Sequence, residues 1–168
     1  MDVRKYFDSV PHGRLFARLQ RIFKDSRLLD LLGRIIESHS HDAGRGLPIG
    51  SLTSQHFANF YLGFFDRFVK ERLRIKGYVR YMDDFVLWSD STQELKRIEA
   101  ATAGYLSDEL DLQVKRCSHI NRTEQGLGFL GCRVYPGRLE LNKQSRLRFR
   151  RKLRALEAAY HDGQAIGR

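Results

Sequence analysis

The chain has 168 residues, with 30 Lys and Arg against 20 Asp and Glu, and a formal net charge of +10. This length suits one domain with a hydrophobic core, and the excess of positive charge favours a polyanionic partner, nucleic acid first. Cys117 and Cys132 lack the spacing of a zinc site or a disulfide framework, and no apolar run reaches the ~18 residues of a membrane span. We therefore expect a protein of the reducing cytoplasm with no membrane partner.

The first stretch, residues 1–12, places Asp2 directly after Met1. An acid so close to the first residue suggests that an upstream strand, and whatever precedes it, has been cut away. Helical spacing of apolar residues from Leu15 onward predicts one helix, and the capping pair Asp25-Ser26 predicts the start of a second. The polar, glycine-containing residues 38–46 predict a loop.

Residues 46–55 form a Gly/Pro-containing turn that runs into a helix. Gly50 lets the backbone approach a ligand closely, and the N–H groups at a helix start attract anions such as phosphate. From Phe57 to about Leu73, aromatic and aliphatic residues recur at helical spacing, which is typical of core packing.

Residues 77–88 contain two adjacent carboxylates, Asp83 and Asp84, between stretches rich in aromatic and β-branched residues. This pattern predicts a strand, a turn and a second strand, with the acids at the tip. Unpaired acids between apolar strands are costly unless a cation neutralises them. Mg²⁺, which binds one or two carboxylates together with substrate phosphates, is the expected ion. The alternative is a solvated Asp-Asp turn.

The rest of the chain alternates helices with strands. We expect a helix at 92–109, a half-buried strand at 110–115, a loop at 118–126, a short hairpin over 127–141 and a basic helix from Asn142. Strands interspersed with hairpins and helices predict an α+β fold rather than a doubly wound sheet.

Taken in this order, the elements resemble the palm of a reverse transcriptase. Residues 2–8 (Asp-Val-Arg-Lys-Tyr-Phe-Asp) resemble the family's first catalytic motif, and residues 46–55 resemble its substrate-binding turn and helix. Residues 81–84 match its Tyr-Met-Asp-Asp signature letter for letter. Residues 112–115 resemble the next motif, and residues 129–131 the primer-grip hairpin. The resemblance covers nearly the whole chain. It implies a polymerase right-hand palm, an antiparallel sheet packed on helices, followed by the start of a helical thumb.

The resemblance also implies an activity, RNA-directed DNA polymerase. Such an enzyme uses two Mg²⁺ ions, with Mn²⁺ as a candidate substitute, to transfer a dNTP onto a primer 3′-hydroxyl. Asp2 and Asp83 would be carboxylate ligands, and Val3 would offer its backbone oxygen. Asp84 belongs to the motif and is usually less directly engaged. Lys115 falls where the family has a lysine thought to protonate the leaving pyrophosphate; its alternative is a solvated lysine at a strand end.

The implied nucleotide-binding residues are Phe7, Ile49, Gly50 and Gln55, beside Val3. Phe7 takes the place of an aromatic that packs under the sugar and excludes a 2′-hydroxyl, with plain core packing as the alternative. Many relatives have Pro-Gln-Gly where this chain has Pro48-Ile49-Gly50. That form resembles reverse transcriptases of bacterial diversity-generating retroelements, with group II intron and then retron-type enzymes as the other options. Loss of the amide predicts looser nucleotide selection.

The implied domains are a palm over residues 1–141, without the fingers that supply basic residues for the triphosphate, and the start of a thumb over residues 142–168. A palm-centred fragment of this kind is expected to have poor or no polymerase activity alone. The expected partners are an RNA template, a DNA or RNA primer and a dNTP, with an accessory protein left open. The residues expected to contact nucleic acid are Phe129, Leu130, Gly131, Arg146, Arg148, Arg150, Arg151 and Arg154.

Two other hypotheses belong to a different class. The chain would be a non-catalytic basic nucleic-acid-binding domain, a truncated or degenerate relative, or else an excised palm with a structural role. The intact Asp2, Asp83 and Asp84 argue against degeneration, although truncation silences an intact site. Metal-dependent dNTP binding separates the catalytic hypothesis from the others. The bacterial, cytoplasmic setting follows from the resemblance alone.

Overall fold

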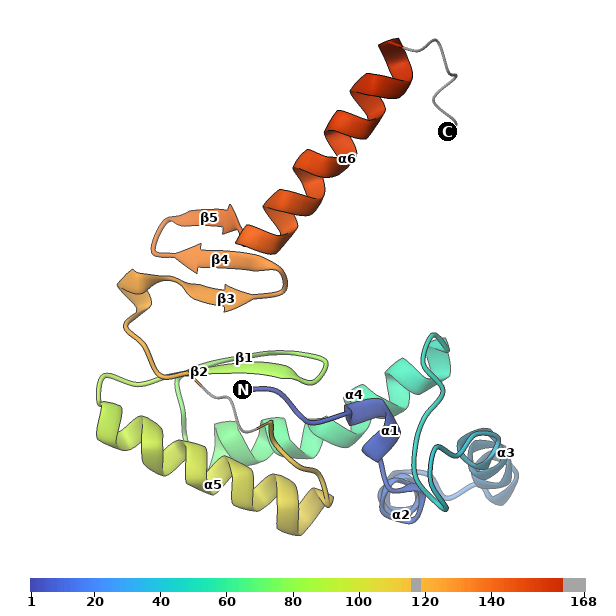
Figure 1. Ribbon diagram of the computed structural model, residues 1–168. Helices are drawn as coiled ribbons and strands as arrows, with labels where there is room; N and C mark the ends of the chain where they lie inside the picture. The colour runs from blue at the N-terminus through green and yellow to red at the C-terminus, as the bar shows by residue number, and fades with distance from the viewer. Residues whose placement is uncertain (116–118, 162–168) are drawn as a thin grey trace. The chain divides into compact units, whose positions relative to one another are not determined.

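The computed structural model describes residues 1–115 and 119–161 (Figure 1). The chain divides into two compact units, Met1–Ile120 and Asn121–Arg168, and each is described here by itself. Helices are combined with two small antiparallel sheets, so the predicted α+β fold is confirmed.

The sheet of the first unit is built on the predicted hairpin of β1 (Gly77–Tyr81) and β2 (Asp84–Trp88), in which Tyr81 pairs with Asp84. Two segments that are distant in the sequence, residues 1–3 and 113–115, extend this sheet through backbone hydrogen bonds. The Phe85 N–H donates to the Met1 carbonyl at 2.9 Å, and the Lys115 N–H donates to the Asp2 carbonyl at 2.8 Å. The start of the chain therefore lies between β2 and residues 113–115, which brings the first predicted motif beside the hairpin.

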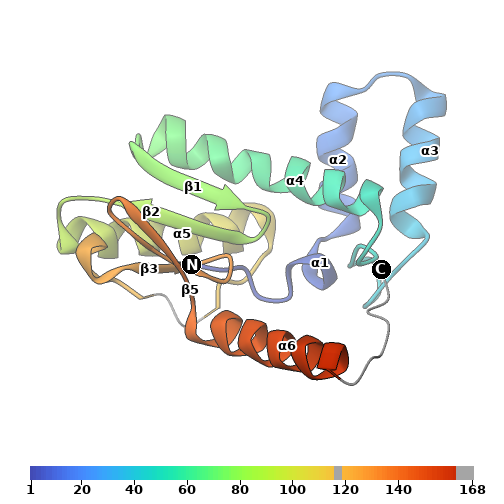
Figure 2. The same ribbon diagram turned by 90° about the horizontal axis from the view of Figure 1, so that it is seen from above.

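Two helices, α4 (Leu52–Arg67) and α5 (Thr92–Leu110), cover one face of this sheet (Figures 1 and 2). Phe65 of α4 is completely buried there, with its ring centroid 4.9 Å from that of Phe85 and 6.3 Å from that of Tyr105. The predicted aromatic stripe is thus core. The helix predicted to reach about Leu73 ends as an α-helix at Arg67 and continues as one π-helical stretch, η1 (Phe68–Arg72).

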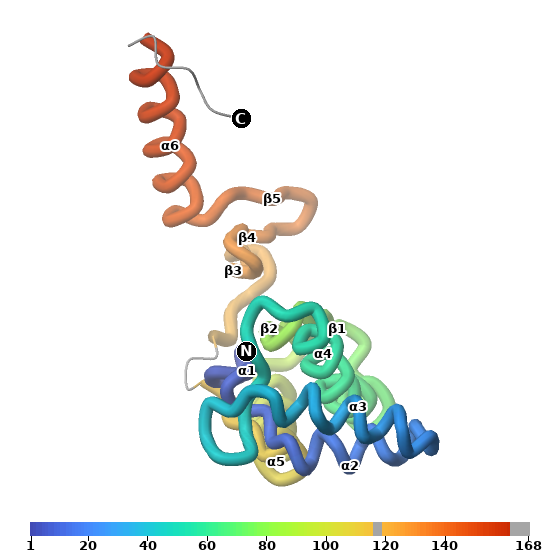
Figure 3. Tube along the Cα trace, turned by 90° about the vertical axis from the view of Figure 1, so that its right-hand side faces the viewer, coloured from blue at the N-terminus to red at the C-terminus, as the bar shows by residue number. Residues whose placement is uncertain are grey.

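Three helices precede α4. A short α1 (Tyr6–Ser9) leads into α2 (His12–Ile22) and α3 (Ser26–Glu37), which lie side by side in Figures 2 and 3. The predicted cap is present, because the Asp25 side chain accepts from the Leu28 N–H at 2.8 Å. Buried His12 forms a 2.6 Å hydrogen bond through Nε2 with the Gly46 carbonyl and so anchors the loop before α4.

The strand predicted at 110–115 is wrong in its first half. Leu110 still belongs to α5, and Asp111 closes that helix in the left-handed conformation at φ 51°. The Asp111 N–H donates to the Ser107 carbonyl at 3.1 Å, the bond that ends a helix in the αL motif, and the Leu112 N–H donates to the Leu106 carbonyl at 2.8 Å. The alternating apolar pattern includes the last helical turn, and only Val114 forms a β-bridge, with Val3.

The second unit begins with a 3₁₀ turn, η2 (Thr123–Gln125), followed by β3 (Leu127–Phe129), β4 (Cys132–Tyr135) and β5 (Arg138–Leu141). These strands form a three-stranded antiparallel sheet in the order β3-β4-β5, one strand more than the predicted hairpin. The predicted basic helix is α6 (Lys143–His161). Cys132 is a free thiol, and Cys117 lies outside the described residues.

Gly126 makes the tightest glycine contact in the second unit's described part. Its φ is +78°, and a Cβ added there would lie 2.5 Å from Tyr135 Cε1. We expect Gly126→Ala to destabilise this unit by about 1–3 kcal/mol, because the ring must shift and the backbone is strained. Limited proteolysis between residues 121 and 141 measures the loss. The control is Gly128→Ala, whose added Cβ meets nothing within 4 Å; equal cleavage of both variants would contradict the prediction.

None of the helices within residues 1–115 and 119–161 has both the length and the apolar character needed to cross a lipid bilayer.

Candidate active site

Three aspartates meet at one end of the first sheet. Asp83 lies in the turn between β1 and β2, Asp84 is the first residue of β2, and Asp2 forms a β-bridge with Asp84. The Val3 N–H also donates to the Asp83 carbonyl at 3.3 Å. The strand pairing therefore brings the segment that starts at Asp2 and the Tyr-Met-Asp-Asp turn together.

The carboxylates of this cluster are poorly compensated by neighbouring groups. Burial, and then the charges of Asp2 and Asp84, raise the pKa of Asp83 above its ordinary value. Burial, and then the charge of Asp2, raise the pKa of Asp84. The Asp2 Oδ1 atom is buried and has no hydrogen-bond partner. Negative charge is thus concentrated where the folded chain itself offers few donors.

Lys115 forms a salt bridge with this cluster, and the positive charge of the Met1 ammonium group also acts on Asp84. The Lys115 ammonium group pairs with Asp2 Oδ2, and its pKa is raised, first by that hydrogen bond. The lysine comes from the segment that follows α5 and is itself largely exposed. No group of three or more His, Cys, Asp and Glu side chains among residues 1–115 and 119–161 is arranged to hold a metal ion.

The predicted nucleotide turn lies at the start of α4. Ile49 is 78% exposed, Gly50 has φ +92°, and the Ser51 side chain makes no capping bond to the helix. Gln55 is exposed one turn into the helix. Within the described residues, no hydrogen bond or ion pair joins Ile49, Gly50 or Gln55 to the three aspartates.

Phe7 is half-buried beside Tyr6, with ring centroids 5.8 Å apart, and its carbonyl accepts from the Leu47 N–H at 2.7 Å. It thus links the segment that follows Asp2 to the loop that carries Ile49. This packing fits both alternatives for Phe7, core residue and sugar contact.

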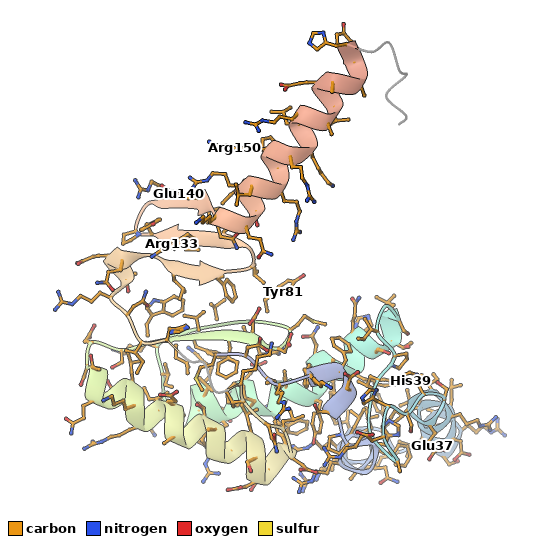
Figure 4. The ribbon with its side chains drawn as sticks, viewed as in Figure 1. Glu37, His39, Tyr81, Arg133, Glu140 and Arg150 are labelled. Carbon is orange, nitrogen blue, oxygen red and sulfur yellow. The ribbon has the colours of Figure 1, made fainter. Side chains whose placement is uncertain are left out.

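The remaining predicted residues belong to the second unit. Phe129 ends β3, and Leu130 and Gly131 form the turn to β4 with φ values of 50° and 78°. The Asn142 N–H donates to the Gly131 carbonyl at 3.1 Å, so the turn is tied to the start of α6. The predicted arginines of α6 are all exposed, and Figure 4 shows Arg150 projecting from this helix. They are Arg146, Arg148, Arg150, Arg151 and Arg154.

Arg80 of β1 is a charged residue that the sequence analysis did not single out. The structure shows it paired with Asp66 of α4 through two hydrogen bonds, of 2.7 and 2.6 Å, and its side chain is only 10% exposed. The alternation of side chains along β1 indicates this inward position. Arg80 shares the inward face with Tyr78, whereas the exposed Tyr81 points away from the helices in Figure 4.

An antiparallel sheet backed by two helices, with acids at a hairpin turn, defines a partial polymerase-palm-like fold. The family model described as reverse transcriptase (RNA-dependent DNA polymerase) matches residues 1–134, and the chain belongs to this family.

Relatives with sequence similarity include the protein YkfC of Escherichia coli K12, 27% identical over 79% of this chain and 45% of YkfC. An uncharacterised 91 kDa protein in the cob intron of Schizosaccharomyces pombe is 33% identical over 41% of this chain and 9% of that protein. A putative COX1/OXI3 intron 2 protein of Saccharomyces cerevisiae is 28% identical over 43% of this chain and 9% of that protein. The chain thus spans less than half the length of these relatives.

Proposed function

We propose that this chain carries the catalytic palm of an RNA-directed DNA polymerase, which transfers dNTPs onto a primer 3′-hydroxyl. The observation that supports it most is the convergence of Asp2, Asp83 and Asp84, from segments about 80 residues apart in the sequence, on one end of the sheet. Family membership supplies the reaction class.

The residues present fit Mg²⁺, with Mn²⁺ as an alternative ion. Asp2 Oδ1 is a buried oxygen without a partner, and burial and neighbouring carboxylates raise the pKa values of Asp83 and Asp84. Mg²⁺ typically takes one or two carboxylates and completes its shell with water and substrate phosphates, so a site with fewer than three side-chain ligands is compatible with it. Asp2 and Asp83, with the Val3 carbonyl, would hold the metal.

When bound, two such ions would activate the primer hydroxyl and offset the charge of the leaving pyrophosphate. The protein's own residues would hold the reactants. The exposed Ile49-Gly50 turn and the start of α4 would receive the nucleotide, because Gly50 leaves its backbone open to close approach. Phe7 would pack under the sugar. Lys115, already placed at Asp2, would deliver a proton to the leaving group.

Lys115 also affects metal binding, since its ammonium group occupies Asp2 and repels a cation. We expect Lys115→Gln to lower the half-saturating Mg²⁺ concentration severalfold while lowering the rate of extension, by about 10²-fold if the lysine acts as the general acid. Metal titrations of the wild-type chain and the variant measure the first effect. Lys96→Gln, at an exposed lysine of α5, is the control. Unchanged metal affinity in Lys115→Gln would contradict the competition.

We base the proposed subtype of reverse transcriptase on the sequence of the nucleotide turn. Ile49 stands where many relatives have glutamine, which favours the error-tolerant enzymes of bacterial diversity-generating retroelements over group II intron enzymes. We expect Ile49→Gln to lower misincorporation severalfold, because an amide restores a hydrogen bond near the incoming nucleotide. Because Ile49 is 78% exposed, the substitution should leave the fold unchanged. Error spectra of parent and variant test this, and equal spectra would remove the idea.

The second unit is proposed to contact nucleic acid. The turn Phe129-Leu130-Gly131 would grip the primer, and the exposed arginines of α6 would contact backbone phosphates of template and primer. Residues 142–168 are proposed as the start of a thumb and residues 1–141 as the palm. An accessory protein is left open as a further partner.

Because the chain alone is expected to extend primers poorly or not at all, primer extension on an RNA template with Mg²⁺ and dNTPs tests the function both on the chain alone and with a fingers region supplied. A DNA template of the same sequence is run beside it. Metal-dependent extension on RNA supports the proposal. If there is no extension, and no metal-dependent dNTP binding either, the alternative is favoured: a non-catalytic basic nucleic-acid-binding relative, for which the net charge of +10 is sufficient.

A further inference from the structure

Arg80 places a charged side chain on the core face of β1. A charge with only 10% side-chain exposure is costly unless it is paired and hydrogen-bonded. Asp66 of α4 supplies the pairing, because its two oxygens accept from Arg80 Nε at 2.7 Å and Nη2 at 2.6 Å. Tyr78 adds a third hydrogen bond, from its hydroxyl to Asp66 Oδ1 at 2.6 Å. The ion pair therefore accounts for two of the three guanidinium nitrogens.

The third nitrogen, Nη1, is directed at the turn. It donates to the Met82 carbonyl at 2.7 Å and to Asn59 Oδ1 at 3.1 Å. Met82 has φ 53°, a left-handed conformation that costs a non-glycine residue roughly 1–2 kcal/mol. A turn in such a conformation persists only when surrounding contacts favour it, and the bond from Arg80 acts directly on its backbone.

We propose that Arg80 is a positioning residue, which holds the Met82 carbonyl against helix α4 and thereby fixes the turn that carries Asp83. The importance of Arg80 for catalysis rests on the proposed function. Its role in holding the turn does not depend on that function. Asn59 and Asp66 are seven residues apart, two helical turns, so they lie on the same face of α4. The same helix begins directly after Ile49 and Gly50. Arg80 thus ties the aspartate turn to the helix whose first turn follows the predicted nucleotide turn.

A lysine cannot replace this arginine, because one ammonium group lacks the planar fork that serves Asp66 and Met82 together. Arg80→Lys keeps the charge opposite Asp66 and so preserves the fold, but it releases the turn. Arg80→Met removes both interactions. Tyr78→Phe is the matched control, because Tyr78 lies on the same strand and the same face as Arg80. This substitution removes one hydrogen bond to Asp66 and leaves the bond from Arg80 to the Met82 carbonyl in place.

Hydrogen exchange of single amides, measured by NMR on the metal-free chain, tests the proposal. The Val3 N–H, bonded to the Asp83 carbonyl, reports on the turn, and the Leu112 N–H, bonded to the Leu106 carbonyl, reports on the rest of the unit. We expect both Arg80 variants to speed exchange at Val3 about tenfold relative to Leu112, the effect of losing one charged hydrogen bond. Tyr78→Phe should leave that ratio within about twofold of wild type.

The proposal is overturned if Val3 and Leu112 change by the same factor in Arg80→Lys, which would make Arg80 a general stabiliser. It is also overturned if Tyr78→Phe changes the ratio as much as Arg80→Lys does. Neither readout uses metal, template or nucleotide. A failure of the proposed polymerase function appears in primer extension, so the two failures are distinguishable.

Discussion

With a fingers region supplied, Asp83→Asn should abolish metal-dependent primer extension, with a loss on the order of 10²–10³-fold or more in rate. Asparagine keeps the size of the side chain but removes the negative charge that a divalent cation requires, and electrostatic contacts to the transition state carry losses of this order. The turn itself should persist, because its backbone bond to Val3 does not involve the Asp83 side chain. Rates with saturating Mg²⁺ and an RNA template measure the effect.

The same substitution should raise the melting temperature of the metal-free protein. Burial and the charges of Asp2 and Asp84 raise the pKa of Asp83 in the fold, so the ionised carboxylate costs folded-state stability at every pH above that raised pKa and costs none below the unfolded value. Asparagine removes this cost at neutral pH. Mg²⁺ should then stabilise the wild-type chain, by about 2.7 kcal/mol at 100 times its dissociation constant, and leave the variant unchanged.

The control is Asp90→Asn, at an exposed aspartate just beyond β2. It should alter neither extension nor the Mg²⁺ effect on melting. Full activity in Asp83→Asn would contradict the assignment of this carboxylate. A loss of activity accompanied by a lower melting temperature would point to a damaged fold instead.

Phe65→Ala is expected to cause the largest loss of stability, about 3–5 kcal/mol. Phe65 is 0% exposed, and its ring lies edge-on to Tyr78 and Phe85, with centroids 6.2 and 4.9 Å away. Removing it leaves a cavity between α4 and the sheet, at the point where the helix supports the strands carrying Asp83 and Asp84. Urea unfolding measures the loss as a lower midpoint with an unchanged slope.

The matched control for this prediction is Phe149→Ala, at a phenylalanine of α6 that is 58% exposed. Its cost should stay within about 0.5 kcal/mol, because exposed substitutions away from special features rarely exceed that. If the two variants unfolded at the same midpoint, the core around Phe65 would not be what stabilises the first unit.

Much of the fold followed from local patterns. The spacing of apolar residues predicted α2, α3, α4 and α5, and the Asp25 cap was read correctly because capping depends on neighbours only. The end of α5 was missed, since Asp111 takes a left-handed conformation that glycine usually supplies. Residues 127–141 were predicted as one hairpin; the turn at Leu130 and Gly131, which divides them into three strands, was missed because Leu130 takes a left-handed conformation at φ 50°.

The site was predictable to a different extent. Only the family resemblance grouped Asp2 with Asp83 and Asp84, since local patterns do not determine pairing between segments so far apart. The link between Lys115 and Asp2 and the network of Arg80 were not predicted as contacts. Both depend on side-chain directions set by tertiary packing. In the structure, the alternation of β1 turns Arg80 inward, and the position of Asp66 on α4 reveals its partner.

The site joins the two ends of the first unit. Lys115 and Asp2 are separated by 113 positions in the chain, and all the helices of the first unit lie between them in the sequence. Closing so long a loop costs conformational entropy, which the packing of the folded unit offsets. Non-local contacts of this kind slow folding. Intermediates that have formed α4, α5 and the hairpin but have not yet docked the first three residues would therefore hold a nearly complete core and no functional centre.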